Sequence, residues 1–503
     1  MNAIYRSLRT FSDKAVKKGA PFRRPIPWKS SEFYDESKLD TELRRVFDVC
    51  HGCRRCFNLC NSFPRLFDLV DNSKTAELNS VPSSEFKSVV DDCTLCDMCA
   101  TTKCPYVPPH EFNIDFPHLM LRYRAVENKT RNVGVEDDLE NVPLSDSAYG
   151  VKASNIASHV EVQAGVPREL KLEPTSFADR LVTSTDTNGN IGSKLSCVAN
   201  AALHNDTVRR LMSTVVDVHH KAAIPPYSPV SFVSTTVPSS VINENAPAFA
   251  VGRKAVLYAT CLVNFNYPAI GHSAVSVLQH NGVSVETSYP GCCGMPQLEQ
   301  GDLSSVAEKA RAVCNALVDF VDRGYQVITL TPSCGLMFRQ EWPLLLPNDP
   351  LVLKVSSSTK DICEYVMDIA KSEGIVRQNM RPLTSGVSLH FACHSRAQNF
   401  GNKALEMLKL IPEAKVNVIE KCSGHGGSWG CKTKKWETAL KVGAPVAKRV
   451  SAALAAGESL VASECALAGL HISQSVSLQH DQKTASVHPI QLLAESYGFQ
   501  HKM

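Results

Sequence analysis

Several classes of protein are excluded by what this sequence lacks. No run of 18 apolar residues occurs along its 503 residues, so no transmembrane helix is expected. Neither a Walker motif nor a G-x-G-x-x-G fingerprint is present, and we therefore expect no flavin or NAD site on this chain. The 53 Lys and Arg side chains nearly balance the 50 Asp and Glu side chains, which argues against a nucleic-acid-binding protein.

Cysteine, by contrast, is abundant, with 19 residues in the chain. Many cysteines are separated by only two residues, a spacing that suits shared metal ligation better than a structural disulfide. The large chain and the odd number of cysteines favour a reducing compartment over a secreted disulfide framework. Four cysteines fall outside every motif and are interpreted as core thiols: Cys197, Cys314, Cys363 and Cys431.

The first 30 residues form a basic N-terminal extension. They contain eight Lys or Arg side chains and one acid, Asp13, while Ile4, Leu8, Phe11 and Ala15 share one helical face. This pattern is typical of a mitochondrial transit peptide, or of an amphipathic segment lying on an anionic membrane. A disordered basic tail is the third interpretation.

Residues 31–126 are predicted to form an α-helical domain. Ser30 or Ser31 is expected to cap a helix that runs to the first cysteines, with apolar residues at helical spacing at Leu39, Leu43, Val46 and Phe47. A polar insertion is predicted at 127–175, and a helical segment followed by a linker at 176–250. Within that segment one apolar stripe is formed by Val208, Leu211, Met212 and Val215.

From residue 251 onward the sequence repeats one pattern twice. Strands are predicted at 255–260, 283–288 and 326–331 in the first copy, and at 387–392, 415–420 and 459–463 in the second. Helical patterns lie between them, which predicts two tandem α/β domains, at 251–350 and 351–503, with largely parallel sheets. The fold class predicted for the whole chain is therefore α + α/β. In each copy cysteines follow the strand ends, where open α/β sheets form their sites.

Two cysteine runs in residues 31–126 have the spacing of iron–sulfur ligands. The first reads C-x2-C-x2-C-x3-C at Cys50, Cys53, Cys56 and Cys60, and the second reads C-x2-C-x2-C-x4-C at Cys93, Cys96, Cys99 and Cys104. In two-cluster ferredoxins the last cysteine of each run serves the other cluster. One [4Fe-4S] cluster is therefore assigned to Cys50, Cys53, Cys56 and Cys104, and the other to Cys93, Cys96, Cys99 and Cys60. Structural zinc is the alternative, but zinc usually takes two separated ligand pairs.

Several segments carry a family resemblance: CHGCRRCFNLCNSFPRLFDL, CTLCDMC, ATCLVNFNYPAIGH, CCGMP and PSCGLMFRQEWP. They resemble the heterodisulfide-reductase-related iron–sulfur proteins, a family that includes the C subunit of anaerobic glycerol-3-phosphate dehydrogenase. The resemblance covers about residues 22–126 and 176–500. It implies an N-terminal α-helical ferredoxin domain with two cubane clusters, followed by two tandem CCG-type domains.

The complete family motif has a leading cysteine, a Cys-Cys-Gly and a closing C-x2-C, and both copies depart from it. The first copy keeps Cys261, Cys292, Cys293 and Cys334 but has Thr331 in place of a closing cysteine. The second keeps Cys393, Cys422 and Cys465, with His425 or His394 as the candidate fourth ligand, while Ser423 and Ala468 replace two cysteines. A further iron–sulfur cluster and a zinc ion are both compatible with these ligand sets, and an emptied site is the alternative for the second copy.

The resemblance also implies a function. We expect an electron-transfer subunit of a membrane-associated oxidoreductase, relaying electrons between a flavoprotein dehydrogenase and quinone. The expected partners are a flavoprotein subunit and a quinone or a membrane-anchor subunit, with peripheral membrane contact and no nucleic acid. The matrix side of the mitochondrial inner membrane is favoured over the bacterial cytoplasm.

Two other functions remain open at this point. One is a heterodisulfide or thiol reductase that acts through the CCG cysteines, and the other is a cluster-bearing structural subunit of a respiratory complex. No catalytic residue is assigned.

Overall fold

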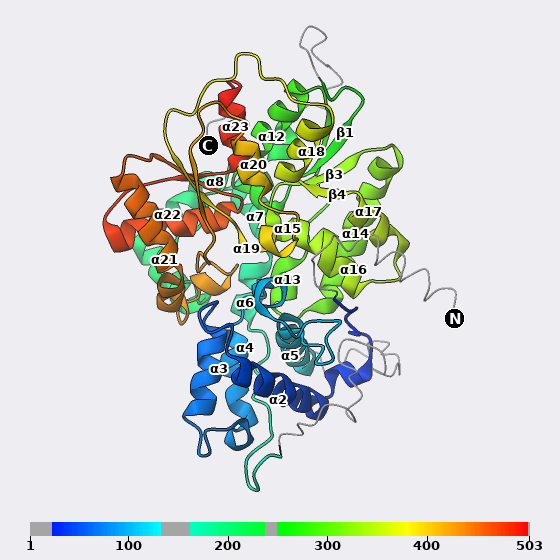
Figure 1. Cartoon of the computed structure of the whole chain (residues 1–503), viewed down its shortest axis with the longest axis vertical. Coiled ribbons are helices and arrows are strands. Elements are labelled where there is room, and N and C mark those ends of the chain that lie inside the picture. Colours follow the sequence, from blue (N-terminus) through cyan, green and yellow to red (C-terminus); the bar gives the residue numbers. More distant parts are fainter. Residues whose placement is uncertain (1–22, 132–160, 237–248, 501–503) are drawn as a thin grey trace. The chain divides into compact units, whose positions relative to one another are not determined.

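The computed structural model of the chain describes residues 23–131, 161–236 and 249–500 (Figure 1). Most of the basic extension, much of the polar insertion and much of the predicted linker lie outside these ranges. The chain divides into two compact units. The N-terminal unit comprises the chain up to Ser176 with Gln297–Ala307 and Pro343–Asn348, and the C-terminal unit comprises the remainder.

Helices joined by loops make up the described part of the N-terminal unit. Its main helices are α2 (Glu36–Cys53), α3 (Ser62–Asp71), α4 (Phe86–Asp91) and α5 (Phe116–Arg131). The predicted apolar face of α2 is confirmed, because Leu39, Leu43 and Phe47 are fully buried. The predicted cap is wrong: the side chain of Asp35 accepts a hydrogen bond from the Lys38 amide at 2.8 Å, since a short 3-10 helix occupies Ser31–Tyr34.

Segments on either side of residues 31–126 also pack into this unit. The guanidinium of Arg23 pairs with Asp115 at 2.9 Å, and the Ile26 amide donates to the Leu344 carbonyl at 2.8 Å. Beyond the predicted boundary, Arg168 pairs with Asp40 at 2.7 Å. Long-range ion pairs and carbonyl contacts of this kind have no sequence period, so the sequence could not reveal that residues outside 31–126 contact this domain.

The C-terminal unit contains two parallel four-stranded sheets. The first has the order β2-β1-β3-β4, built from β1 (Lys254–Tyr258), β2 (Ser284–Ser288), β3 (Gln326–Thr329) and β4 (Thr359–Asp361). The second has the order β6-β5-β7-β8, built from β5 (Val387–His390), β6 (Val416–Ile419), β7 (Leu460–Ser463) and β8 (Ser486–Val487). The same strand order in both confirms the duplication and the α + α/β class.

The first copy is longer than predicted. Strand β4 pairs with β3, Val327 facing Thr359, so the first sheet extends past the boundary expected at 350. The sequence missed β4 and β8 because strands of three and two residues are too short to show an alternating pattern. We use "first copy" for β1 to the helix after β4, and "second copy" for β5 to the C-terminal helix.

Helices alternate with the strands in both copies. In the first copy they are α11 (Cys261–Phe265), α12 (Pro268–His280), α13 (Met295–Glu299), α14 (Leu303–Asp322), α15 (Pro332–Leu336), α16 (Trp342–Leu345), α17 (Pro350–Ser357) and α18 (Ile362–Ser372). In the second they are α19 (Cys393–Ala397), α20 (Lys403–Leu408), α21 (Trp436–Ala455), α22 (Ala466–His480) and α23 (Pro489–Ser496).

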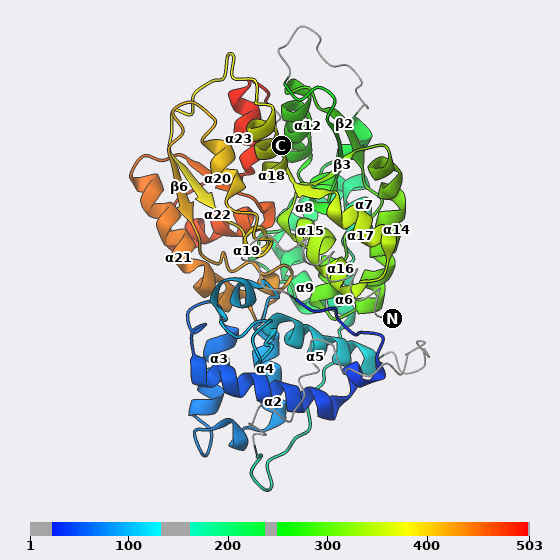
Figure 2. The ribbon, with the colours of Figure 1, turned by 45° about the vertical axis from the view of Figure 1, so that its right-hand side comes forward.

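The two copies share one hydrophobic core. Helix α23 of the second copy packs against α12 of the first, and α18 packs against α20, as both views show (Figures 1 and 2). The cluster of buried side chains includes Leu257 and Val277 from the first copy and Leu389 and Leu493 from the second. A separate, smaller cluster around Val450 lies between α21, α22 and the second sheet.

In the described part of the C-terminal unit, five helices precede the first sheet, and the first four are α6 (Phe177–Thr183), α7 (Thr185–Lys194), α8 (Ser196–His204) and α9 (Asp206–Val215). The apolar stripe predicted on α9 is not a buried face, because Leu211 is 63% and Val215 61% exposed, whereas Arg209 is only 5% exposed. A short helix α10 (Phe232–Thr235) follows, and Phe232 is fully buried, so this part of the predicted linker is anchored in the core. Within the described ranges, no helix is long and apolar enough to cross a membrane.

The shared core predicts that a core substitution in α23 weakens the first copy as well. Leu493→Ala removes a fully buried side chain and should cost about 2–5 kcal/mol of unfolding free energy. Hydrogen exchange followed by mass spectrometry should then accelerate in peptides of α12 as well as in those of α23.

Val450→Ala, in the separate cluster, is the matched control and should leave exchange in α12 unchanged. Exchange that accelerates only in the second copy of the Leu493 variant would show that the copies are independent.

Candidate functional site

The eight N-terminal cysteines lie on the last turn of α2, on the loops that follow α2 and α4, and at the π-helical turn Cys99–Lys103. Cys50 and Cys53 belong to α2, which ends where Arg54 adopts a left-handed conformation with φ of 53°. In the second run, Leu95 and Asp97 are also left-handed, with φ of 47° and 61°. Such residues are uncommon outside glycine, and here they reverse the chain between successive cysteines.

An ion pair holds the second cysteine loop in this conformation. Arg23 donates to the Asp97 carboxylate at 2.8 Å and to Asp115 at 2.9 Å. The pKa of Asp115 lies far below its usual value, because the charge of Arg23 and the neighbouring His118 outweigh the effect of burial. Arg23 therefore has a structural role, although it lies in the segment predicted as a basic extension.

The eight thiols fall into two groups that mix the two runs. Burial raises the pKa of Cys50, and Cys104, Cys56 and Cys53 raise it further. Burial likewise raises the pKa of Cys60, whose neighbouring thiols are Cys96 and Cys93. The last cysteine of each run thus lies near cysteines of the other run, the neighbourhood that the exchanged ligand assignment requires.

These groups are chemically suited to a cationic cofactor. Burial raises the pKa of both Cys56 and Cys93 to about 12, so the thiolates cannot form together without a compensating positive charge. Iron would supply that charge, and each thiolate of a four-iron cluster binds its own iron atom. The donor set therefore fits two [4Fe-4S] clusters, whose presence stays a prediction.

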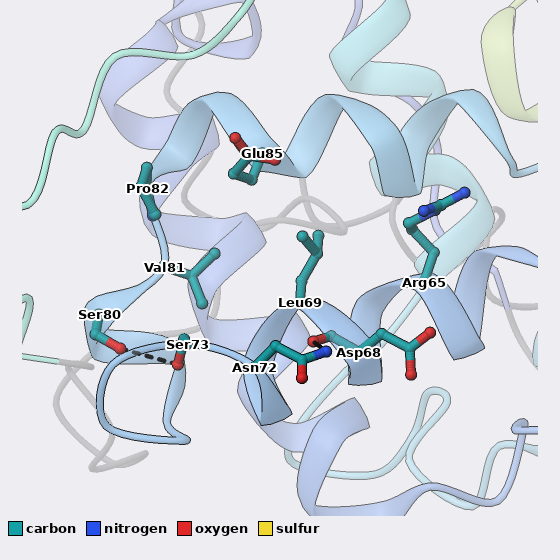
Figure 3. Close-up of a pocket in the computed structure, with 9 residues that line it drawn as sticks. All are labelled: Arg65, Asp68, Leu69, Asn72, Ser73, Ser80, Val81, Pro82 and Glu85. Atoms are coloured by element: carbon teal, nitrogen blue, oxygen red, sulfur yellow. Dashed lines mark hydrogen bonds between the residues drawn. The ribbon is translucent and has the colours of Figure 1, made fainter.

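A surface pocket of about 380 Å³ also lies in this unit, between α3 and the turn that leads to α4. Leu69 and Val81 project into it, and Arg65 and Glu85 lie at its margin (Figure 3). None of the eight cysteines lines this pocket, so it is distinct from the thiol groups.

In the first copy, all four predicted cysteines are brought together just beyond the carboxyl ends of the strands. Cys261 begins α11 after β1, Cys292 and Cys293 follow β2, and Cys334 lies in α15 after β3. Their thiols form a chain of contacts in which Cys261 and Cys293 both contact Cys292, and Cys293 contacts Cys334. Cys292 accepts hydrogen bonds from both neighbours, which lowers its pKa well below the ordinary value.

Helix α7 adds residues to this site that no motif in the sequence marks. The hydroxyl of Thr185 donates to Cys292 Sγ at 3.4 Å. Next to it, the Asp186 carboxylate accepts from the Tyr289 hydroxyl and from Lys309 Nζ, the latter at 2.8 Å. Since these contacts join residues more than 100 positions apart, helical periodicity could not reveal them.

The second copy brings only two of its cysteines together. Cys393, at the start of α19, donates to Cys422, and the Gly424 amide approaches Cys422 Sγ at 3.4 Å. These hydrogen bonds lower the pKa of Cys422 to about 7. Cys465 lies apart from these two thiols. Burial raises its pKa, and the nearby thiol of Cys334, in the first copy, raises it further.

Neither candidate histidine is placed as a clear fourth ligand. His425 is buried, which lowers its pKa to about 3, and its ring lies 6.1 Å from that of His471. His394 contacts the Ser333 hydroxyl at 3.0 Å. In the part of the chain that the structure describes, no three Cys, His, Asp or Glu side chains surround one point as ligands of a single metal ion.

Two buried carboxyl groups lie at strand ends beside these thiols. Asp361 ends β4, and Glu464 follows β7 directly before Cys465. Burial raises the pKa of Asp361 to about 7 and that of Glu464 to about 8, where the charge of Asp361 adds to the effect. The Ala392 amide, which donates to Glu464 at 3.0 Å, opposes the shift. At neutral pH, Glu464 is therefore mostly protonated.

Comparison with known proteins supports the resemblance seen in the cysteine motifs. The family model for the cysteine-rich domain CCG matches residues 255–339. The C subunit of the anaerobic glycerol-3-phosphate dehydrogenase of Escherichia coli is 24% identical over 421 residues, which cover 81% of this chain and 98% of that protein.

Two further relatives match shorter stretches. Lactate utilization protein A of Bacillus pumilus is 28% identical over 36% of this chain and 75% of its own length. The B subunit of the fumarate reductase (CoM/CoB) of Methanothermobacter marburgensis is 26% identical over 49% of this chain and 47% of its own length.

The buried carboxyl of Glu464 predicts a specific dependence of stability on pH. The folded state keeps a proton that the unfolded state loses above its ordinary pKa, so this residue makes the protein less stable as pH rises from about 4.5 to 8. Glu464→Gln is neutral at every pH. Relative to the parent, it should be more stable at pH 8.5 than at pH 5 by roughly 2–4 kcal/mol, measured by urea denaturation.

Glu458→Gln is the control, since that carboxylate lies before β7, at the opposite end of the strand. A Glu464 variant whose stability relative to the parent is the same at both pH values would contradict the burial argument.

Proposed function

We propose that this chain is an iron–sulfur electron-transfer subunit of an oxidoreductase. It has a CCG cysteine-rich domain and is a homologue of the C subunit of anaerobic glycerol-3-phosphate dehydrogenase. Its N-terminal unit would hold two [4Fe-4S] clusters that relay electrons from a flavoprotein dehydrogenase toward quinone. The observation that carries the proposal is the grouping of eight buried or half-buried thiols into two sets of four, each drawing its last member from the other run.

The cysteines and Arg124 of the N-terminal unit would have distinct roles in such a relay. The clusters, when bound, would accept and pass on single electrons. Cys50, Cys53, Cys56 and Cys104 would hold one of them, and Cys93, Cys96, Cys99 and Cys60 the other. Cys93 and Cys99 are buried, which limits the access of water to these two members of one thiol group. Arg124, whose charge lowers the pKa of Cys93, would stabilise its thiolate.

The electrons must come from another protein. No flavin or NAD fingerprint occurs in the sequence, so this chain lacks a recognisable group for oxidising an organic substrate. Two relatives are named as lettered subunits of a dehydrogenase and of a reductase, which supports a partner subunit. We propose a flavoprotein partner and an assembly held at a membrane surface by a quinone-binding or anchor subunit.

A second candidate function is thiol or disulfide reduction in the C-terminal unit. The contact between Cys393 and Cys422 favours it, because two thiols in contact, one with a pKa of about 7, suit thiol–disulfide exchange. The four thiols of the first copy form a comparable chain. This reaction would still draw its electrons from the N-terminal unit.

The cluster assignment predicts the iron content of the protein. Anaerobically prepared protein should contain about eight iron atoms from the N-terminal unit, as two four-iron clusters require. Replacing Cys53 and Cys96 by Ser together should remove most of this iron, because the two substitutions take one ligand from each cluster. Iron analysis and visible absorption would measure the loss.

Cys197 lies outside every motif and is exposed, so its interpretation as a core thiol was wrong. Cys197→Ser is therefore the matched control and should retain the full iron content. Unchanged iron in the double variant would refute the assignment.

The proposal that the last cysteine of each run binds the cluster of the other run makes a sharper prediction. Cys60→Ser should perturb the electron paramagnetic resonance signal of the same cluster as Cys96→Ser, although Cys60 lies in the first run. Perturbation of the cluster affected by Cys53→Ser would instead show that each run serves its own cluster.

The proposed assembly can be tested on native membranes. A salt wash should release the chain together with a flavin-containing companion and with dye-coupled dehydrogenase activity, because electrostatic attachment weakens as ionic strength rises. Protein that is recovered alone at low salt, without flavin, would favour the free thiol reductase.

A further inference from the structure

Arg124, on helix α5, joins three segments of the N-terminal unit through its guanidinium. Helix α5 packs against α4 (Figure 2) and against the π-helical turn Cys99–Lys103. The Nη2 atom of Arg124 donates to the Val90 carbonyl at 2.8 Å and to the Cys93 carbonyl, and Nη1 donates to the Glu299 carbonyl at 2.8 Å. Among the described residues, these partners are all neutral carbonyl groups and none is a carboxylate. The charge of Arg124 is therefore left uncompensated beside Cys93.

This charge acts on one of the two thiol groups. The second thiol group consists of Cys60, Cys93, Cys96 and Cys99. Burial raises the pKa of Cys93, and Arg124 is the largest effect that opposes burial. The carboxylate of Asp97 acts against Arg124, but it is itself paired with Arg23 at 2.8 Å. Arg124 therefore remains available to offset the negative charge of the second thiol group.

In the first thiol group, the nearby cations are either paired or exposed. This group consists of Cys50, Cys53, Cys56 and Cys104. Arg45, which acts on Cys50, donates two hydrogen bonds to the Glu42 carboxylate, at 2.6 and 2.7 Å. Lys103, which acts on Cys56, is exposed, so water screens its charge. A half-buried guanidinium without a carboxylate partner thus distinguishes the second group from the first.

We propose that Arg124 is a positioning residue that raises the reduction potential of the iron–sulfur cluster held by the second thiol group. This inference rests on the proposed function. Reduction adds one negative charge to a cluster whose thiolate ligands are already negative, so burial disfavours reduction. A cation held nearby favours it, because the attraction grows with each negative charge on the cluster.

The two thiol groups differ in burial as well as in charge. Cys93 and Cys99 of the second group are buried, whereas all four cysteines of the first group are half-buried. Burial alone would therefore make the second cluster the harder of the two to reduce. Arg124 offsets this effect, and thereby allows one electron to pass from the first cluster to the second. That step moves no proton and breaks no bond.

The turn after α13 holds Arg124 in place. Helix α13 ends at Glu299, whose carbonyl accepts from Arg124, and this segment belongs to the N-terminal unit. At Gly301, where φ is 75°, a Cβ atom would lie 2.3 Å from the carbonyl carbon of Arg124. The turn can approach the backbone of α5 this closely only with glycine at that position. Backbone groups on two sides thus hold the guanidinium beside Cys93.

A redox titration of the anaerobically prepared full chain, followed by electron paramagnetic resonance, tests the proposal. In Arg124→Gln, reduction of the cluster whose signal Cys96→Ser perturbs should become at least tenfold less favourable, a shift of about 59 mV to lower potential. Arg124→Lys keeps the positive charge and should retain most of the parent's potential. Neither variant should shift the potential of the first cluster.

Lys129→Gln is the matched control, since it removes one positive charge from the same helix at a side chain whose Nζ lies 4.3 Å from the centre of the Tyr34 ring. It should leave both potentials unchanged. The inference is overturned if Arg124→Gln does not lower the potential, or if Arg124→Lys lowers it equally. Loss of half the iron in both variants would also overturn it, because holding the three carbonyls would then explain the role of Arg124. A parent chain without either cluster signal would instead overturn the proposed function, and this inference with it.

Discussion

Parallel strand pairing is the constraint on which the C-terminal unit depends. In each copy, the first strand pairs with the two that follow it, so all three strands end at the same edge of the sheet. Residues that are far apart in sequence, such as Cys261, Cys292 and Cys334, thereby meet without any local motif that joins them. The buried carboxyl groups Asp361 and Glu464 reach the same edges for the same reason.

In the N-terminal unit, the cysteines are brought together by different means. Its cysteines are two or three residues apart, so local backbone conformation is sufficient to turn three of them toward one point. Only the fourth member of each group, Cys60 or Cys104, must come from a distance. Arg23 contributes to this geometry because its ion pair with Asp97 fixes a loop that contains two left-handed residues.

The features that could be predicted from the sequence are those with a short period or a short spacing. The cysteine runs, the six longer strands and the buried face of α2 are of this kind. The cap at Asp35, the short strand β4 and the contact of Thr185 with Cys292 depend on three-dimensional packing, and no local pattern reveals them. On α9 the pattern was misleading. Leu211 and Val215 are exposed, whereas Arg209 is buried, because its guanidinium donates hydrogen bonds to backbone carbonyls of the loop after the helix.

The core shared by the two copies bears on how a duplicated protein can change over time. The second copy has Ser423 and Ala468 at positions where the complete motif would have cysteines, while α23 supplies Leu493 to the packing around α12. The residues that could bind a metal and the residues that maintain the packing are therefore different residues in that half. Its cysteines can be lost one at a time, but the half itself cannot be deleted, because the first copy would be left with an uncovered apolar face. A gene for such a protein can therefore lose cysteine codons from one repeat and still keep its full length.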